Sequence, residues 1–436
     1  MVGKDLNATL ERLYRRRSLG IRPGIEMTAA ILDRLDAPQD AYNVVHIAGT
    51  NGKGSVAAML ESVLRSAGVR TALYTSPHLV AFNERFRVNG EAIQDAGLRD
   101  LLDAVEEHAA AVARQTGRES TFFEYATVAA FEHFRRENVD LAVIETGMGG
   151  RLDATNVVKP VLTIITRIGM DHTMYLGDTV ELIAQEKCGI IKPGCPLVSA
   201  GMDDDALGVV VRSAAAAGVT HVHAPEAASV RVKSASWLGQ KIEIETQQAG
   251  YGTLELPLVG RHQVENLATS IVAAEVLSSV AGLSVDKEHV KAGIAAVRWL
   301  GRCQVLREEP LLVLDGAHNA GGARALARTF ARLSPGCPLG IVVGMCDDKD
   351  VREFLAAFPR AGGKLWAVPV PSERSVAPRD MCDVARRLGW EATESDVASA
   401  LRETREWCVA TGGVGCVTGS LFLAGQVLGE WLTVDG

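Results

Sequence analysis

The stretch from Val44 to Leu60, VVHIAGTNGKGSVAAML, joins an apolar run, a glycine-rich turn with one lysine, and a segment with helical spacing. This is the strand–loop–helix order of a phosphate-binding loop, in which backbone N–H groups and a helix N-terminus surround an anion. The loop residues would be Gly49, Thr50, Asn51, Gly52, Lys53, Gly54 and Ser55. The motif is imperfect, because its first glycine is only three positions before Gly52 and Gly54 separates the lysine from Ser55. We predict a nucleotide site, although similar turns also occur in α/β proteins that bind none.

Acidic residues follow two further apolar runs. Glu145 ends LAVIETG, and Asp171 and His172 follow VLTIITRIGM. Acids at strand ends beside a phosphate loop supply the oxygen ligands of an ATP-bound Mg²⁺, and the alternative is that they cap a helix or face water. Because a hard cation prefers oxygen, the residue types alone favour Asp171 over His172 as the ligand.

The glycine cluster at residues 147–150, GMGG, also follows an apolar run. A dinucleotide site would need a helix directly after these glycines. The next residues, RLDATNVVKPV, are polar and typical of turns, so the sequence argues against NAD.

Lys187 and Asp315 are the remaining charged residues with open interpretations. In VELIAQEKCGIIKPG, Lys187 shares a helical face with Ile183 and Ile190, and the pattern alone favours a side chain whose ammonium reaches solvent at the edge of that face. Asp315 in LLVLDGAHN stands with His318 at the end of what we expect to be the first strand of the second domain, facing the domain junction. It would either bind a ligand or cap the helix that begins near Gly321.

Strands that alternate with helices must position these side chains. Several of the strands are apolar throughout, which predicts an α/β fold with a parallel sheet covered on both faces. We expect a large phosphate-loop, ATPase-like domain over residues 1–300, with a small antiparallel appendage from about Val230 to Pro257. A smaller doubly wound, Rossmann-like domain would cover residues 301–436 after a short junction. Ligands of such sheets bind at the carboxyl ends of the strands.

The composition narrows the class of protein. A net charge of −8 argues against nucleic acid as a partner. The eight cysteines are scattered without a Cys-x-x-Cys pair, as in a reducing compartment. The N-terminus lacks the apolar core of a signal peptide, and no apolar run approaches membrane-spanning length. We therefore expect a cytoplasmic protein with no membrane partner.

Taken together, the motifs resemble the folylpolyglutamate synthase and dihydrofolate synthase family, relatives of the Mur peptidoglycan ligases. The segments that carry the resemblance are HIAGTNGKGSV, YTSPHLVAFNERFRVNGE, TFFEYATVAAF, ETGMGGRLDATNVV, MDHTMYLGDTVELIAQEKCGIIKPG, GRHQVENLATS, WLGRCQV, LDGAHN and GMCDDKD. They run along nearly the whole chain. The SPHL…NERFRVNGE block and GGRLDATN are not features of the Mur branch, whose substrates carry a UDP-sugar.

The resemblance implies an ATP-dependent ligase that joins L-glutamate to a folate or to dihydropteroate through an acyl phosphate. It implies ATP on the phosphate loop and two Mg²⁺ ions, one at Ser76 and Glu145 and one at Glu145, His172 and a carbamylated Lys187. The implied catalytic residues are Lys53, Glu145, His172, Lys187 and, more weakly, His318. The implied contacts of the nucleotide from across the cleft are Asn266, Arg302 and Asp315. The implied pterin contacts are Thr121, Phe122, Phe123, Glu124, Leu152, Asp153 and Ala154.

Some positions depart from the family pattern and leave open the choice between folate and dihydropteroate. These are Ala320, Leu300, Arg167 and Met27. Local positive charge for anionic substrates would come from Arg85, Arg87 and Arg151, or these arginines simply face solvent. The alternative functions are a Mur-type ligase and a nucleotide-dependent switch without turnover. The expected form is a monomer.

Overall fold

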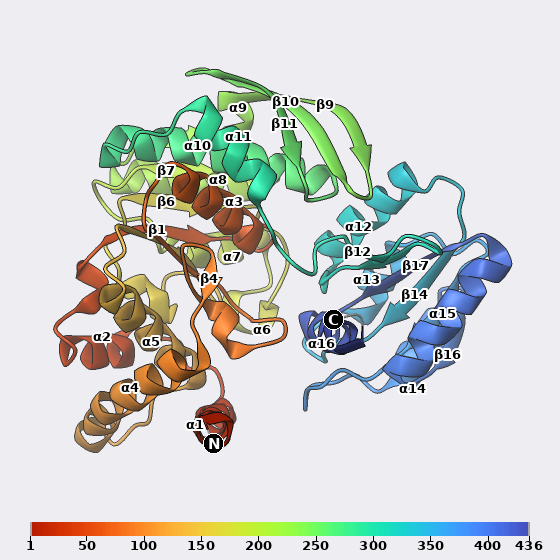
Figure 1. Ribbon diagram of the computed structural model, residues 1–436, viewed down its shortest axis with the longest axis horizontal. Helices are drawn as coiled ribbons and strands as arrows, with labels where there is room; N and C mark the ends of the chain where they lie inside the picture. Colours follow the sequence, from red (N-terminus) through yellow and green to blue (C-terminus); the bar gives the residue numbers. More distant parts are fainter. Residues whose placement is uncertain (1, 435–436) are drawn as a thin grey trace.

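The computed structural model describes residues 2–434 and contains three β-sheets (Figure 1). An eight-stranded and a three-stranded sheet belong to the N-terminal part of the chain, and a six-stranded sheet belongs to the C-terminal part. Helices lie between the strands of the two larger sheets. The predicted α/β class is confirmed.

The largest sheet has the strand order β4-β3-β2-β5-β1-β6-β7-β8. Neighbouring strands from β2 to β8 are parallel, and β3 and β4 extend the sheet antiparallel at one edge. In chain order its strands are β1 (Asn43–Ala48), β2 (Thr71–Tyr74), β3 (Phe86–Val88), β4 (Glu91–Ala92), β5 (Leu141–Glu145), β6 (Leu162–Ile165), β7 (Leu197–Ser199) and β8 (His221–His223).

Helices cover both faces of this sheet. Successive side chains of a strand point to opposite faces, so Val45 and Ile47 join one buried cluster and Val44 joins another. The helices of this part are α1 (Val2–Arg15), α2 (Glu26–Asp33), α3 (Lys53–Ser66), α4 (Asp95–Thr116), α5 (Phe122–Arg136), α6 (Thr173–Leu176), α7 (Val180–Cys188), α8 (Asp204–Ala217), α9 (Ala224–Ala227), α10 (Arg261–Ala281) and α11 (Lys287–Ala296), with 3₁₀ turns at Arg16–Leu19, Pro38–Asp40, Phe82–Arg85 and Ala154–Val157. Burial on both faces explains why most residues of the central strands are apolar.

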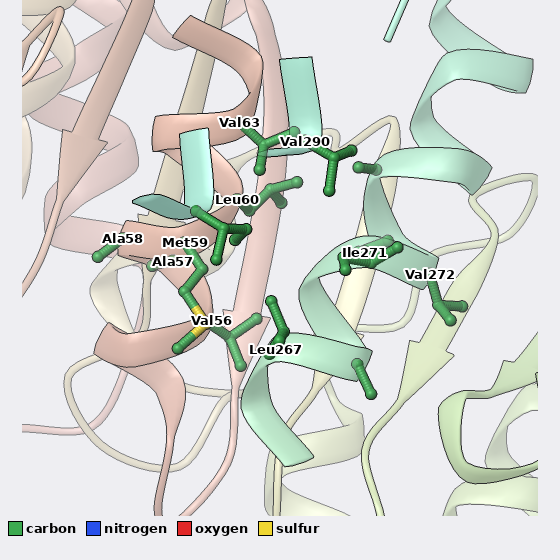
Figure 2. Close-up of a cluster of buried hydrophobic side chains, with 14 of the residues drawn as sticks. Val56, Ala57, Ala58, Met59, Leu60, Val63, Leu267, Ile271, Val272 and Val290 are labelled. Carbon is green, nitrogen blue, oxygen red and sulfur yellow. The ribbon is translucent and has the colours of Figure 1, made fainter. Parts of the chain in front are cut away.

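The helix after the phosphate loop is anchored in the core. Figure 2 shows Val56, Leu60 and Val63 of α3 directed toward Leu267 of α10 and Val290 of α11. All five side chains are buried. Because this packing fixes α3, the loop at its N-terminus is held in a defined place.

By length and composition, α10 could also cross a membrane. No apolar run of that length was predicted from the sequence. Helix α10 is the one such helix within the described residues, and 67% of its apolar window is buried inside the protein. Its apolar character is explained by its packing against α3, as in the core helix of a globular domain.

The three-stranded sheet consists of β9 (Ala228–Ser236), β10 (Gly239–Thr246) and β11 (Gly250–Leu256), all antiparallel. Its β9–β10 turn reaches the C-terminal part of the chain. There the Trp237 ring lies 4.8 Å from the Phe330 ring, and its Nε1 donates a hydrogen bond of 3.0 Å to Ser334 Oγ. The predicted appendage therefore connects the two parts of the molecule.

The C-terminal sheet has the order β12-β13-β17-β14-β15-β16. Its elements are β12 (Gln304–Arg307), β13 (Leu312–Leu314), α12 (Ala320–Leu333), β14 (Leu339–Val343), α13 (Val351–Ala356), β15 (Lys364–Ala367), α14 (Pro378–Arg387), β16 (Glu391–Glu394), α15 (Val397–Thr411), β17 (Val414–Thr418) and α16 (Leu421–Val434). The interpretation of LLVLDGAHN as the first strand was wrong, because β12 precedes it and pairs antiparallel with β13. The other strands are parallel, so the loops after β13 and β14 leave the same edge.

Candidate active site

The phosphate loop runs from the end of β1 to the start of α3, as its sequence predicts. Gly49 has φ +156°, and a Cβ atom there would lie 1.9 Å from Thr166 Oγ1. Gly52 has φ +94° and precedes the helix directly. Thr50 Oγ1 donates to Gly169 O at 3.0 Å, which ties the loop to the segment after β6. Only glycine fits at these two positions, which leaves the helix N-terminus accessible to an anion.

Two lysines share one acceptor in this loop. Lys53 Nζ lies 3.2 Å and Lys187 Nζ 2.9 Å from the carbonyl oxygen of Gly49. Glu145, at the end of β5, places Oε1 3.8 Å from Lys53 Nζ. The loop, α7 and the neighbouring strand therefore bring two amines and one carboxylate to the same point.

The Lys187 side chain is buried, with 4% of the residue exposed. The interpretation that its ammonium reaches solvent was therefore wrong, because the loop covers the edge of the apolar face. Burial, with the Lys53 charge as a second cause, lowers the pKa of Lys187 to about 7. Much of its amine is then neutral at physiological pH, which is the form that reacts with carbon dioxide.

The Glu145 carboxylate is buried at the end of β5, beside Lys53. Burial raises its pKa, and the Lys53 charge opposes that rise. Its Oε2 accepts a hydrogen bond of 3.2 Å from the backbone N of Ser76. Among residues 2–434 no group of three His, Cys, Asp or Glu side chains is placed to hold a metal ion. This donor set fits Mg²⁺ only if phosphate oxygens and water complete its shell, which is how Mg²⁺ is usually held in nucleotide sites.

Asp171, whose residue type suggests a metal ligand, contacts two side chains of the C-terminal part. Its Oδ1 accepts from Lys349 Nζ at 2.5 Å, and its Oδ2 accepts from Asn319 Nδ2 at 3.0 Å. Both donors belong to the C-terminal part of the chain. The two oxygens of Asp171 therefore contact donors of the C-terminal part, and its role as a metal ligand stays a prediction.

His172 lies between two carboxylates. Its Nε2 is 3.9 Å from Asp171 Oδ1, and its Nδ1 is 3.8 Å from Asp348 Oδ2. Burial lowers the pKa of His172 to about 4, so the imidazole is neutral at pH 7 and able to coordinate a metal. His318 Nε2 lies 3.8 Å from Asp171 Oδ2, so it joins the same junction.

The loop also touches the C-terminal part directly. Asn51 and Asn319 exchange two amide hydrogen bonds of 3.3 and 3.2 Å, and Asn319 also caps α12 by accepting from the Gly322 backbone N. No sequence pattern indicated that Asn51 would do more than bind phosphate. A local sequence pattern can predict the Asn319 cap of α12, but it cannot predict the pairing of Asn319 with Asn51 in the other domain.

The three residues expected to contact the nucleotide from across the cleft differ in where they lie. Asn266 of α10 lies against it, since a Cβ on Gly52 would be 2.5 Å from Asn266 Oδ1. Asp315 is fixed within its own domain, because it accepts from the backbone N of Cys303 and of Ala317 at 2.8 Å each. Arg302 lies beside Asp315, within 2.7 Å of where a Gly316 Cβ would be.

The expected pterin residues form two neighbouring segments. Thr121 and Glu124 make the capping box of α5, and Glu124 also pairs with Arg118 at 2.8 Å. Phe123 packs against Gly147, where a Cβ would meet its ring at 2.4 Å. The other segment is Leu152, Asp153 and Ala154, in which the buried Asp153 carboxylate accepts from the backbone N of Met148 and of Thr155 at 2.9 and 3.0 Å. Thr121, Glu124 and Asp153 thus have local structural roles. The two segments lie close together, because Phe123 packs against Gly147 and the adjacent Met148 donates to Asp153.

The three candidate arginines differ in burial. Arg85 is buried, donates to His78 Nδ1 at 2.9 Å, and its Nη1 has no hydrogen-bond partner in the described chain. Arg87 is partly buried and donates to the Glu84 carbonyl. Arg151 is exposed and pairs with Glu186 at 2.8 Å. Arg151 therefore fits the solvent-facing alternative, and Arg85 does not.

Comparison with known proteins identifies the family. The Mur ligase middle domain matches residues 47–274, and the Mur ligase glutamate ligase domain matches residues 301–421. The chain is 32% identical to the dihydrofolate synthase/folylpolyglutamate synthase of Bacillus subtilis over 95% of this chain and 96% of that protein. It is 34% identical to the folylpolyglutamate synthase of Lacticaseibacillus casei, over 91% and 92% of the two chains.

Solved structures give the same result. The Mycobacterium tuberculosis folylpolyglutamate synthase complexed with ADP superimposes with a TM-score of 0.91 at 30% identity, and the match covers 99% of both chains. A structure described as an FPGS–AMPPCP–folate complex gives a TM-score of 0.83 at 30% identity, over 98% of this chain and 99% of that one. The chain belongs to the folylpolyglutamate synthase and dihydrofolate synthase family of the Mur ligases.

Proposed function

We propose that the protein is an ATP-dependent ligase that adds L-glutamate to a folate, to dihydropteroate, or to both. The observation that carries the proposal is that Lys53 and Lys187 both donate to the Gly49 carbonyl beside a helix N-terminus, with Glu145 3.8 Å from Lys53. Related proteins of this family are solved with ADP, and with AMPPCP and folate. A carboxylate is a poor acylating agent, so ATP must first convert it to an acyl phosphate.

The phosphate loop supplies the binding of ATP in this proposal. Backbone N–H groups from Gly49 to Ser55 and the start of α3 would surround the phosphates, and Lys53 would neutralise the outer charge. Asn266 lies on the loop, and Arg302 and Asp315 would contact the nucleotide from the other side. Phosphoryl transfer brings two anions together, so positive charge placed before the reaction lowers its barrier.

Two Mg²⁺ ions would be held by Ser76, Glu145, His172 and a carbamylated Lys187, with phosphate oxygens completing their shells. When bound, Mg²⁺ neutralises charge on the transferring phosphoryl group. The chain itself prepares this arrangement, because burial keeps His172 neutral and lowers the pKa of the Lys187 amine toward its reactive form. Carbamylation would turn a buried cation into an oxygen anion.

The acceptor would lie against Phe122 and Phe123 at the start of α5 and against Leu152 and Ala154. Phe123 is fixed by its contact with Gly147, at the end of the strand that carries Glu145. A carboxylate seated from this side would face the phosphate loop. The glutamate amine would then displace phosphate from the acyl phosphate through a tetrahedral intermediate, on the side of His318 and the C-terminal domain.

ADP release tests the function directly. We expect turnover only when ATP, Mg²⁺, L-glutamate and either dihydropteroate or a reduced folate are all present. Equal turnover without any pterin would refute the proposal. Turnover with a UDP-muramoyl acceptor would instead support a Mur-type ligase, and ATP binding without glutamate-stimulated turnover would support a nucleotide switch.

We also propose that residues 1–300 form the ATP-binding domain and residues 301–436 the glutamate-ligase domain of a cytoplasmic monomer. All eight cysteines are free, which suits a reducing compartment. Each nominated side chain comes from one chain, so no second copy is needed to complete the site. Limited proteolysis near residue 300, light scattering and cell fractionation would test the three statements.

A further inference from the structure

Lys349 joins the two domains at the edge of the candidate site, and the mechanism above gives it no role. It lies in the loop after β14, and its Nζ is 2.5 Å from Asp171 Oδ1 and 3.3 Å from Asp348 Oδ2. The side chains of Lys349 and Asp171 are only 9% and 7% exposed. A surface ion pair contributes little, but breaking a buried one leaves an uncompensated charge.

The oxygen that Lys349 binds also holds His172. Asp171 Oδ1 accepts a hydrogen bond of 2.8 Å from the backbone N of His172. His172 has φ +49°, a left-handed conformation that costs free energy for a residue with a side chain. Its imidazole lies between Asp171 and Asp348, the two carboxylates that contact Lys349. The lysine thus touches both groups that confine the histidine.

We propose that Lys349 is a positioning residue of the ligase: by binding Asp171 across the domain boundary, it fixes the backbone and the imidazole of His172. The site would then be complete only while the C-terminal domain is docked. The inference rests on the proposed function for its effect on turnover, but not for its effect on docking. Arg374, whose Nη1 lies 3.6 Å from Asp348 Oδ1, contacts the same loop from the segment between β15 and α14.

Domain docking can be measured without turnover. Cys337 is the exposed cysteine among the eight free ones, and Glu107 on α4 is exposed in the N-terminal domain. Dyes on Cys337 and on a cysteine replacing Glu107 would report the docked fraction by energy transfer. We expect Lys349→Met to lower that fraction with ADP bound. The matched control is Lys364→Met, which breaks a 2.8 Å ion pair with Glu391 between β15 and β16, inside the C-terminal domain.

Steady-state kinetics separate positioning from a merely structural role. We expect Lys349→Met to lower kcat about 30-fold and to change the KM for ATP less than about threefold, because the phosphate loop is untouched. Lys349→Arg keeps the charge and should recover most of the loss in both readouts. Asp171→Asn combined with Lys349→Met should cost no more than the worse single change, because both break the same contact.

Three outcomes would overturn the inference. The first is a Lys349→Met protein with wild-type kcat and a wild-type docked fraction. The second is a loss of kcat with unchanged docking, additive with Asp171→Asn, which would place the lysine directly on a substrate. The third is a docked fraction that Lys364→Met lowers equally. If the wild-type protein shows no glutamate-dependent turnover, the ligase proposal fails, and the docked fraction still tests Lys349.

Discussion

Replacing Lys187 by methionine should abolish turnover and yet stabilise the fold. The Lys187 pKa falls from 10.5 to about 7 because the amine is buried, with Lys53 as a second cause. At pH 7, a shift of this size corresponds to a free-energy cost of about 4 kcal/mol for burying the amine. The hydrogen bond to Gly49 O offsets about 1 kcal/mol of this cost. Methionine has a similar shape and no charge, so the free energy of unfolding should rise by about 3 kcal/mol.

The sign of the pH dependence follows from the same shift. Between pH 7 and 10.5 the unfolded chain holds more protons at this lysine than the folded chain, so wild-type stability rises with pH in that window. The advantage of Lys187→Met is therefore largest at and below pH 7 and disappears toward pH 10.5. Urea unfolding in carbon dioxide-free buffer at several pH values measures both. Lys192→Met, a less buried lysine nearby in the chain, is the control and should change stability far less.

Labelled bicarbonate tests the chemical consequence. At pH 7 about half of the Lys187 amines are neutral, compared with about one in three thousand for an ordinary lysine. Carbon-13 NMR should therefore show one carbamate signal that is missing in Lys187→Met. Equal unfolding free energies of the two proteins at every pH would refute the burial argument. A wild-type enzyme that is active in bicarbonate but shows no such signal would refute the carbamate.

Three other changes have definite expected results. Lys53→Ala should lower ADP release by about 100-fold or more with the fold intact in circular dichroism, since its amine contacts phosphate and not the core. Gly150→Ala should destabilise the protein by about 1–3 kcal/mol in urea, because the new Cβ would meet Lys187 O at 2.6 Å, whereas Gly250→Ala has open space. Trp237→Ala should weaken the coupling between the domains, so that calorimetry resolves two transitions in place of one.

The sequence was sufficient for the architecture because local pattern and burial agree. Every residue of β1 after Asn43 is buried and all of these but His46 are apolar, as expected for a strand in a sheet covered on both faces. The glycines of the phosphate loop also follow from backbone geometry alone. Strand lengths were harder to predict: β6 ends at Ile165, six residues before Asp171, so the acid lies in a loop and not at the strand end.

Contacts between the domains could not be read from the sequence. The residue type of Asp171 suggests a metal ligand, and only the fold brings Lys349 and Asn319 to its two oxygens. Similarly, Lys187 sits on an apolar helical face whether or not another loop covers it. Contacts between residues of different domains depend on how the two folded domains dock, and no local sequence pattern predicts that docking. The segment GMCDDKD carried the resemblance, but nothing in it assigned a role to its lysine.

The paired amides of Asn51 and Asn319 bear on how the enzyme ages. Asn51 is followed by Gly52, and asparagine before glycine is chemically labile, because a backbone nitrogen without a neighbouring side chain can attack the amide carbon. The two hydrogen bonds to Asn319 restrain the Asn51 amide from turning toward that nitrogen. We therefore expect docking of the C-terminal domain to slow deamidation of the phosphate loop. During storage, residue 51 should gain a negative charge more slowly in the wild-type enzyme with ADP bound than in Lys349→Met. Peptide mapping would measure this difference.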